Sequence, residues 1–292
     1  MLLKRPFTED APVRWLTVFA RELESRESSG VIRPVVGVRS PWSSLRPVHP
    51  FPAAFIALDE ELVSGGAGLA ADVVVSGSAL DWCRQAANWV NETGGDLNVD
   101  SRGLNQRVAV DGAARYMLRG LHVDANAYVS SADADAGRAA HATVSRNGQL
   151  VCQLYNADPV LAAQLERVRE MLTADPAVTR LGFVLGTQRR VLDWLALESR
   201  WPALGSLTPP LFRRNDPIWS SQVPDACGIQ LLTQRHLDRA ADLSAWQVEE
   251  LCPGRYLVEA ADVEGWYGPH GPSESTLAQA RSDFGAMIVD PA

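Results

Sequence analysis

Three polar residues, His122, Asp124 and Asn126, stand at every second position of GLHVDANAYVSS, which spans residues 120–131. This alternation is typical of a β-strand and would place the three side chains on one face. A carboxylate beside an imidazole raises the basicity of the ring, as general acid/base catalysis requires. His122 and Asp124 are therefore the predicted catalytic pair if the protein is an enzyme. The open alternative is the solvated face of a strand.

A metal site is not expected near this stretch. His141 falls on the next predicted strand, and the expected pairing places it roughly 13 Å from His122 at ~3.3 Å per residue. Metal ligands must lie about 2 Å from one ion. The run SADADAG at 131–137 has spaced aspartates but lacks the bidentate glutamate of a calcium loop, so it predicts a polar turn.

Two further clusters could bind an anion. Ser76, Gly77 and Ser78 lie between an apolar run and a helical pattern, and backbone N–H groups at a helix start can hold a phosphate or carboxylate. Arg102 and Arg107 could grip an acidic ligand in bidentate fashion. These five residues are the predicted ligand-binding set. The open alternatives are an ordinary serine cap and a local salt bridge.

Composition excludes several chemistries. Lys4 is the only lysine among 27 cationic residues, which removes Schiff-base catalysis and the phosphate-loop lysine unless Lys4 serves. Gly66-x-Gly68-x-x-Ala71 is followed by a strand rather than the helix that a dinucleotide motif needs. We therefore predict no cofactor and no metal.

Charge and cysteine content narrow the partners. The formal net charge of −8 disfavours nucleic acid, because phosphate binding draws on clustered cations. No run approaches the roughly 18 apolar residues of a membrane helix, so we predict a cytoplasmic protein without a membrane partner. The four cysteines are widely spaced and are expected to be reduced and mostly buried.

The elements that must position these residues begin with a helix over 10–25, which Asp10 and Pro12 would start. Residues 53–63 fit a helical stripe or a buried strand, and comparison with a later segment favours helix. A short strand, a tight turn and a helix with Ser78 at its start follow in ADVVVSGSALDWCRQAANWVNETGG.

Residues 96–155 predict an antiparallel meander, because the apolar pattern alternates. Asp111-Gly112 and Asn147-Gly148 are dipeptides typical of tight hairpin turns. DPVLAAQLERVREMLTADP then predicts an amphipathic helix, followed by the strand RLGFVLG and a second helix. Three strands, a short helix and a last helix from Ser273 to Phe284 complete the pattern. The fold class is α+β, with a mixed, largely antiparallel sheet and packed helices.

Two similar segments of the sequence suggest an internal repeat. VVVSGSALDWC and FVLGTQRRVLDWL share a strand, a small-residue turn and a helix start. If 53–63 is helical, both copies read helix, strand, helix. We predict a single globular unit over 1–292, with two related halves, 1–95 and 96–292, as an alternative.

Two functions are compatible with the sequence. The first is a protein-binding protein of the inhibitor, immunity or accessory kind, without its own catalysis. Its recognition surface would use aromatic residues on proline-rich loops, because aromatics dominate contact energies at interfaces. These are Trp42, Phe51, Phe212 and Trp219. The alternative is an enzyme acting on a small phosphorylated or carboxylate molecule by general acid/base chemistry.

Overall fold

The computed structural model describes residues 53–64, 74–92, 96–101, 104–123, 125–133, 138–155, 161–186, 217–268 and 270–289. All of them belong to one compact unit of the chain, formed by 41–200 and 207–292. The predicted helices over 10–25 and after 186 lie outside the described residues. The predicted site residues that lie outside them are Trp42, Phe51, Arg102, Asp124 and Phe212.

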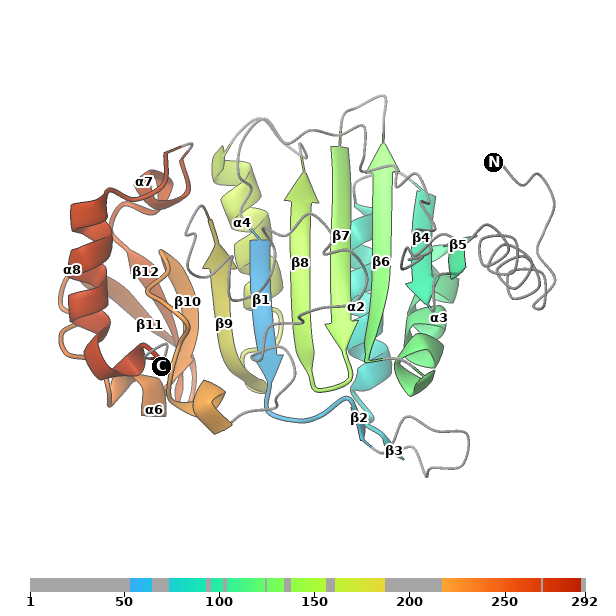
Figure 1. Ribbon diagram of the computed structural model, residues 1–292, viewed down its shortest axis with the longest axis horizontal. Helices are drawn as coiled ribbons and strands as arrows, with labels where there is room; N and C mark the ends of the chain where they lie inside the picture. The colour runs from blue at the N-terminus through green and yellow to red at the C-terminus, as the bar shows by residue number, and fades with distance from the viewer. Residues whose placement is uncertain are drawn as a thin grey trace, which may run out of the picture. The chain divides into compact units, whose positions relative to one another are not determined.

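A ten-stranded sheet organises the described residues (Figure 1). Its order is β11-β12-β10-β9-β1-β8-β7-β6-β4-β5, and each described pairing of neighbouring strands is antiparallel. This confirms the α+β class with a largely antiparallel sheet. The strands are β1 (Ala53–Leu58), β4 (Asp96–Ser101), β5 (Leu104–Val108), β6 (Asn126–Asp133), β7 (Arg138–Ser145), β8 (Gln149–Tyr155), β9 (Thr179–Leu185), β10 (Ile229–Thr233), β11 (Trp246–Cys252) and β12 (Arg255–Ala260).

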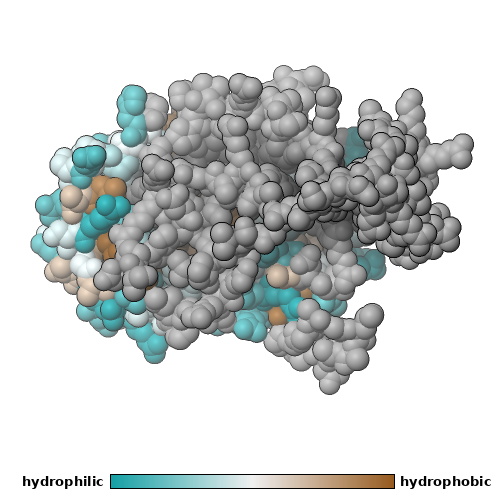
Figure 2. Space-filling view, viewed as in Figure 1, coloured by the Kyte–Doolittle hydropathy of each residue, from teal (hydrophilic) through white to brown (hydrophobic). Residues whose placement is uncertain are grey.

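Helices α2, α3 and α4 lie behind the sheet in the view of Figure 1. The predicted helix after 78 is confirmed as α2, and its buried face contains the tryptophans and small residues that the pattern indicated. The helices are α2 (Ala79–Asn91), α3 (Val110–Val123), α4 (Leu161–Leu172), α6 (Gln234–Leu237), α7 (Val263–Tyr267) and α8 (Glu274–Phe284), with short 3-10 turns η3 (Pro217–Ser220) and η4 (Gly285–Met287). Hydrophilic residues make up much of the coloured surface around α8, with small apolar areas between them (Figure 2).

The core continues on both faces of the central strands. At Gly182 of β9, an added Cβ would clash with the side chain of Leu172 of α4, so this helix packs closely on that face. The next residue, Phe183, points to the other face and stacks on Phe55 at 4.7 Å between ring centroids. Trp219 packs on Phe55 at 6.1 Å and closes this side of the core.

The prediction of a helix over 53–63 was wrong, because residues 53–58 form strand β1. β1 lies between β8 and β9, and Ala54 to Leu58 are all buried. A strand covered on both faces loses the apolar/polar alternation and reads as a continuous apolar run. Sequence periodicity could not separate this run from a helix.

The strand and hairpin predicted around Asp111-Gly112 were also wrong. Residues 110–123 form helix α3, with Ala113, Met117 and Leu121 buried one turn apart. This helical stripe decides the structure, and Gly112 sits in the first turn. The Asn147-Gly148 turn is confirmed between β7 and β8, where Gly148 has a φ of 76°.

The predicted internal repeat depended on a helix over residues 53–63, and the structure has a strand there. β3 (Val74–Val75) pairs only with β2 (Val63–Ser64) among the described strands, in a separate two-stranded sheet. Its proposed counterpart β9 lies inside the ten-stranded sheet, and the segment before β3 contains strand β1 rather than a helix. The division into two halves stays a prediction.

The hydroxyl of Tyr267 bridges β9 and β10 at the point where their backbone pairing ends. β9 and β10 pair at Gln230–Phe183 and Leu231–Gly182. Beyond these pairs, the Tyr267 Oη donates to the carbonyl of Val184 at 2.9 Å and accepts from the backbone N–H of Ile229 at 2.9 Å. Tyr267 therefore links β9 to β10 through its side chain.

Candidate functional site

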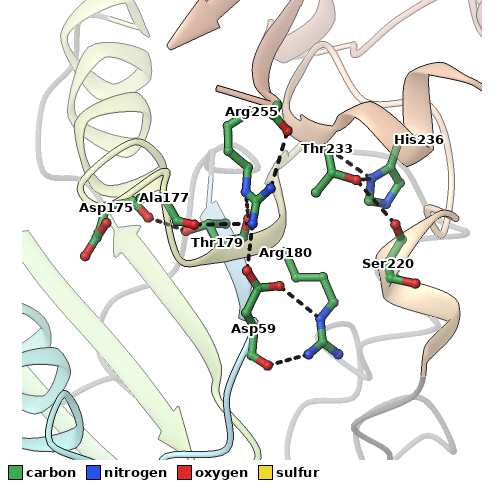
Figure 3. Close-up of polar contacts among 10 residues, drawn as sticks. Asp59, Asp175, Ala177, Thr179, Arg180, Ser220, Thr233, His236 and Arg255 are labelled. Atoms are coloured by element: carbon green, nitrogen blue, oxygen red, sulfur yellow. Dashed lines mark hydrogen bonds and ion pairs between the residues drawn. The ribbon is translucent and has the colours of Figure 1, made fainter. Parts of the chain in front are cut away.

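An open pocket of about 390 Å³ lies at one end of the sheet, beside the start of β9 and the end of β10. Its volume falls within the range of small-ligand sites, roughly 300–1,000 Å³. Figure 3 shows two of its arginines, Arg180 and Arg255, beside Asp59. The pocket is lined by Asp59, Arg180, Ser220, Thr233, Gln234, Arg235, Gly254 and Arg255.

Strand ends place the charged residues of the pocket. Asp59 follows the last residue of β1, and Arg180 is the second residue of β9. Arg255 begins β12, and Arg235 lies in the short helix α6 directly after β10. Antiparallel pairing brings these ends to the same edge of the sheet, although the residues are distant in sequence.

Asp59 holds two guanidinium groups in place (Figure 3). The Arg255 Nη2 donates to Asp59 Oδ2 at 2.6 Å, and the Arg180 Nη2 donates to the Asp59 carbonyl at 2.6 Å. Arg255 also donates to the carbonyls of Thr179 at 2.9 Å and Ala177 at 3.2 Å. These contacts fix both arginines before any ligand arrives.

The pocket is positively charged. Its lining has three arginines and one carboxylate, a formal charge of +2, in a chain whose formal net charge is −8. Arg235 is exposed and makes no ion pair with any described residue. A guanidinium binds a carboxylate or phosphate through two parallel N–H groups. The lining is therefore chemically suited to an anionic group.

His236 lies next to the pocket and has a structural role. Thr233 and His236 cap α6 reciprocally: the Thr233 side chain accepts from the His236 N–H, and the His236 Nδ1 accepts from the Thr233 N–H at 3.1 Å. Burial lowers the pKa of His236 to about 4. Its neutral form is required, because a protonated Nδ1 cannot accept a hydrogen bond.

We expect the stability of the protein to fall by about 2 kcal/mol between pH 6.5 and pH 5 because of this one residue. The unfolded histidine has a pKa of about 6.5, whereas that of folded His236 is about 4. Between these values the unfolded chain binds a proton that the folded chain does not, so stability is lost as the pH falls. Urea unfolding at several pH values measures the effect.

The matched control for this prediction is H236Q. Glutamine at this position can accept from the Thr233 N–H, as in a common capping box, but does not titrate. The variant should lose about 2 kcal/mol less than the wild type over the same range. Equal losses in the two proteins would exclude His236 as the cause.

The hydroxyls of the predicted serine cradle contact another side chain of the protein. Ser78 stands at the start of α2 without capping a helix N–H through its side chain. Instead, the Ser76 Oγ donates to Glu60 Oε1 at 2.8 Å, and the Ser78 Oγ contacts the same oxygen. Gly77 has open space around it. Glu60 therefore lies beside the start of α2 and is held there by the two serine hydroxyls.

The predicted catalytic histidine is on a helix rather than a strand. His122 is exposed in the last turn of α3. Arg107 is exposed on β5 and pairs with Asn98, whose neighbours Leu97 and Val99 are buried beneath the helices. Arg107 thus lies on the sheet face away from α3, and the structure does not bring it to His122.

The solvated sheet face predicted for the middle of the chain is present on β6 and β7. Ala127 and Val129 are buried, whereas the intervening Tyr128 is 36% exposed. His141 stacks on Tyr128 at 5.9 Å between ring centroids. Among the described residues, no group of three His, Cys, Asp or Glu side chains could hold a metal ion.

Trp219 is the one residue of the predicted aromatic surface that the structure describes. It is only 2% exposed and packs in the core beside Phe55. Its ring therefore stabilises the fold rather than presenting a contact surface.

The cysteine prediction is confirmed. None of the four cysteines forms a disulfide, and Cys83, Cys152 and Cys227 are buried. Burial raises the pKa of Cys83 and of Cys152 to about 12, so neither supplies a thiolate nucleophile near neutral pH.

The sequence did not reveal the arginine pocket. Asp59 and Arg255 are 196 residues apart, and neither stands in a recognisable motif. The one available signal was the cluster Gln234-Arg235-His236 directly after a strand, which reads equally well as a helix start.

Comparison with known proteins finds one weak structural similarity. No family model and no curated protein matches the chain. A solved structure, the Pseudomonas aeruginosa T6SS protein PA0821, aligns over 94% of this chain and 86% of its own, with 10% sequence identity and a TM-score of 0.43. Similarity of this degree carries no information on function. None of the described helices is long and apolar enough to cross a membrane.

Proposed function

We propose that the chain is a protein-binding protein of the inhibitor, immunity or accessory kind, without its own catalysis. In this proposal the arginine-lined pocket receives an acidic group of the partner. The observation that carries it is a pocket with a formal charge of +2 on a chain with a formal charge of −8. The cytoplasmic location and the absence of nucleic-acid and membrane partners belong to the same proposal.

The pocket is suited to recognition because it is assembled in advance. Arg180 and Arg255 are held by Asp59 and by backbone carbonyls, so little side-chain freedom remains to be lost on binding. Arg235 is exposed and makes no ion pair with a described residue, so its N–H donors are available to a ligand. A carboxylate that enters the pocket could bind the Arg235 guanidinium without first displacing another described residue from it.

The same geometry does not favour the alternative enzyme. A small phosphorylated or carboxylate molecule could enter the pocket, but acid/base chemistry needs a group ready to exchange a proton. Asp59 already accepts from Arg180 and Arg255, and no histidine is among the residues that line the pocket. His122 with Asp124 stays the proposed pair only if a substrate reaches the far end of α3.

The test compares the wild type with R235Q in two measurements. Isothermal titration uses a short glutamate-containing peptide and its glutamine counterpart, and affinity purification with mass spectrometry uses the full chain. We expect the glutamate peptide to bind about tenfold more weakly to R235Q, as the loss of one charge-assisted contact implies. A protein partner should be reduced in the R235Q sample and displaced by the glutamate peptide.

The control is R119Q, which removes an exposed arginine that stacks on Tyr116 of α3 and does not line the pocket. It should bind the peptide and the partner like the wild type. If R235Q and R119Q retain the same partners and the same peptide affinity as the wild type, the pocket is not the recognition site. Turnover of a small anionic compound by the wild type, lost in R235Q, would favour the enzyme.

A further inference from the structure

Strand β11 forms an outer edge of the ten-stranded sheet, where only β12 pairs with it among the described strands (Figure 1). Residues 247–250 are all exposed. An edge strand presents a row of backbone N–H and C=O groups that can pair with an added strand. β11 is seven residues long, which is enough for such pairing.

The side chains of β11 favour a partner of a particular kind. Val248 is 44% exposed and would pack against an apolar residue of an added strand. Glu249 is exposed on the opposite face of the strand, where a cation would complement it. Glu250 accepts from the N–H of Gly254 at 3.0 Å and so belongs to the β11–β12 turn.

A second copy of this chain is a poorer occupant. Pairing β11 with itself would bring Glu249 and Glu250 of each copy onto one pair of strands, and like charges across strands are destabilising. A strand with basic residues would instead form opposite-charge pairs. Charge complementarity thus selects a basic extended segment of another protein.

We propose that β11 binds an extended segment of a partner protein by strand addition, with an apolar residue against Val248 and a lysine or arginine opposite Glu249. The proposal rests on the proposed protein-binding function and adds a second contact surface to it. It does not use the arginine pocket, so the two can fail independently.

The probe is the acetylated and amidated peptide Lys-Val-Lys-Val-Lys-Val, with Glu-Val-Glu-Val-Glu-Val as its charge-reversed counterpart. Amide hydrogen exchange of the full chain, followed by NMR, should slow at every second residue of β11 when the lysine peptide is added, because alternate backbone groups point outward. A lysine peptide methylated on alternate backbone nitrogens should give no such protection.

The decisive variant is E249K. It should weaken binding of the lysine peptide about tenfold and let the glutamate peptide bind, because the cross-strand charge pair is reversed. The control E170K changes an exposed glutamate on α4 and should behave like the wild type. R235Q should also bind the lysine peptide normally, which separates this surface from the pocket.

Two results would overturn the proposal. One is binding of the lysine peptide without period-two protection along β11. The other is equal affinity of the wild type and E249K for the lysine peptide.

Discussion

Replacement of Arg281 by leucine is expected to lower the free energy of unfolding by about 4 kcal/mol, because it removes the ion-pair partner of a buried carboxylate and leaves it, among the described residues, only the N–H of Ala226. Asp225 is fully buried, and both of its oxygens accept from Arg281, at 2.9 Å from Nε and 2.7 Å from Nη2. This pair ties α8 to the segment before β10. Urea unfolding of R281L and the wild type measures the loss.

An exposed pair of the same residue types is the control. Arg84 and Asp81 contact each other on α2, with side chains that are 50% and 63% exposed. R84L should therefore cost less than about 1 kcal/mol. R281K should fall between the two, since lysine keeps the charge but not the two-pronged geometry. A loss below about 1 kcal/mol in R281L would show that water already compensates Asp225.

The substitution Y267F is expected to lower the free energy of unfolding by about 3 kcal/mol, although it removes one oxygen atom only. That oxygen is the partner of both the Val184 carbonyl and the Ile229 N–H. Tyr267 is 4% exposed, so water does not readily replace it. Burial raises the pKa of Tyr267 well above the ordinary value, so the phenol keeps the proton that it donates.

The control for Y267F is Y256F. The Tyr256 hydroxyl donates to the Gln234 side chain at 2.7 Å at the surface, where water can take its place. Y256F should leave the unfolding curve nearly unchanged. If Y267F unfolds at the same urea concentration as Y256F, the two strands do not depend on the tyrosine.

Most elements with one side facing water could be predicted from their apolar pattern. α2 and α4 carry clear apolar stripes, and α8 begins at the predicted Ser273. β1 escaped this reasoning because both of its faces are buried. α3 escaped it because Asp111-Gly112 matched a hairpin dipeptide while Met117 and Leu121 already matched a helix.

The candidate site was much less predictable than the fold. Ser76, Gly77 and Ser78 were predicted to bind an anion through backbone N–H groups, and nothing local indicated that the two serine hydroxyls contact Glu60. The arginine pocket requires the ends of β1 and β10 to meet the beginnings of β9 and β12. Strand order decides that arrangement, and a prediction with residues 53–63 as helix could not contain it.

The contact of Glu60 with the serine turn also affects which dissolved anions can bind there. Because the carboxylate is tethered to its binding position, its effective concentration there is on the order of millimolar or higher. Dissolved phosphate or organic acids would have to compete with this intramolecular occupant. The start of α2 should therefore bind dissolved anions only weakly as long as Glu60 keeps this contact.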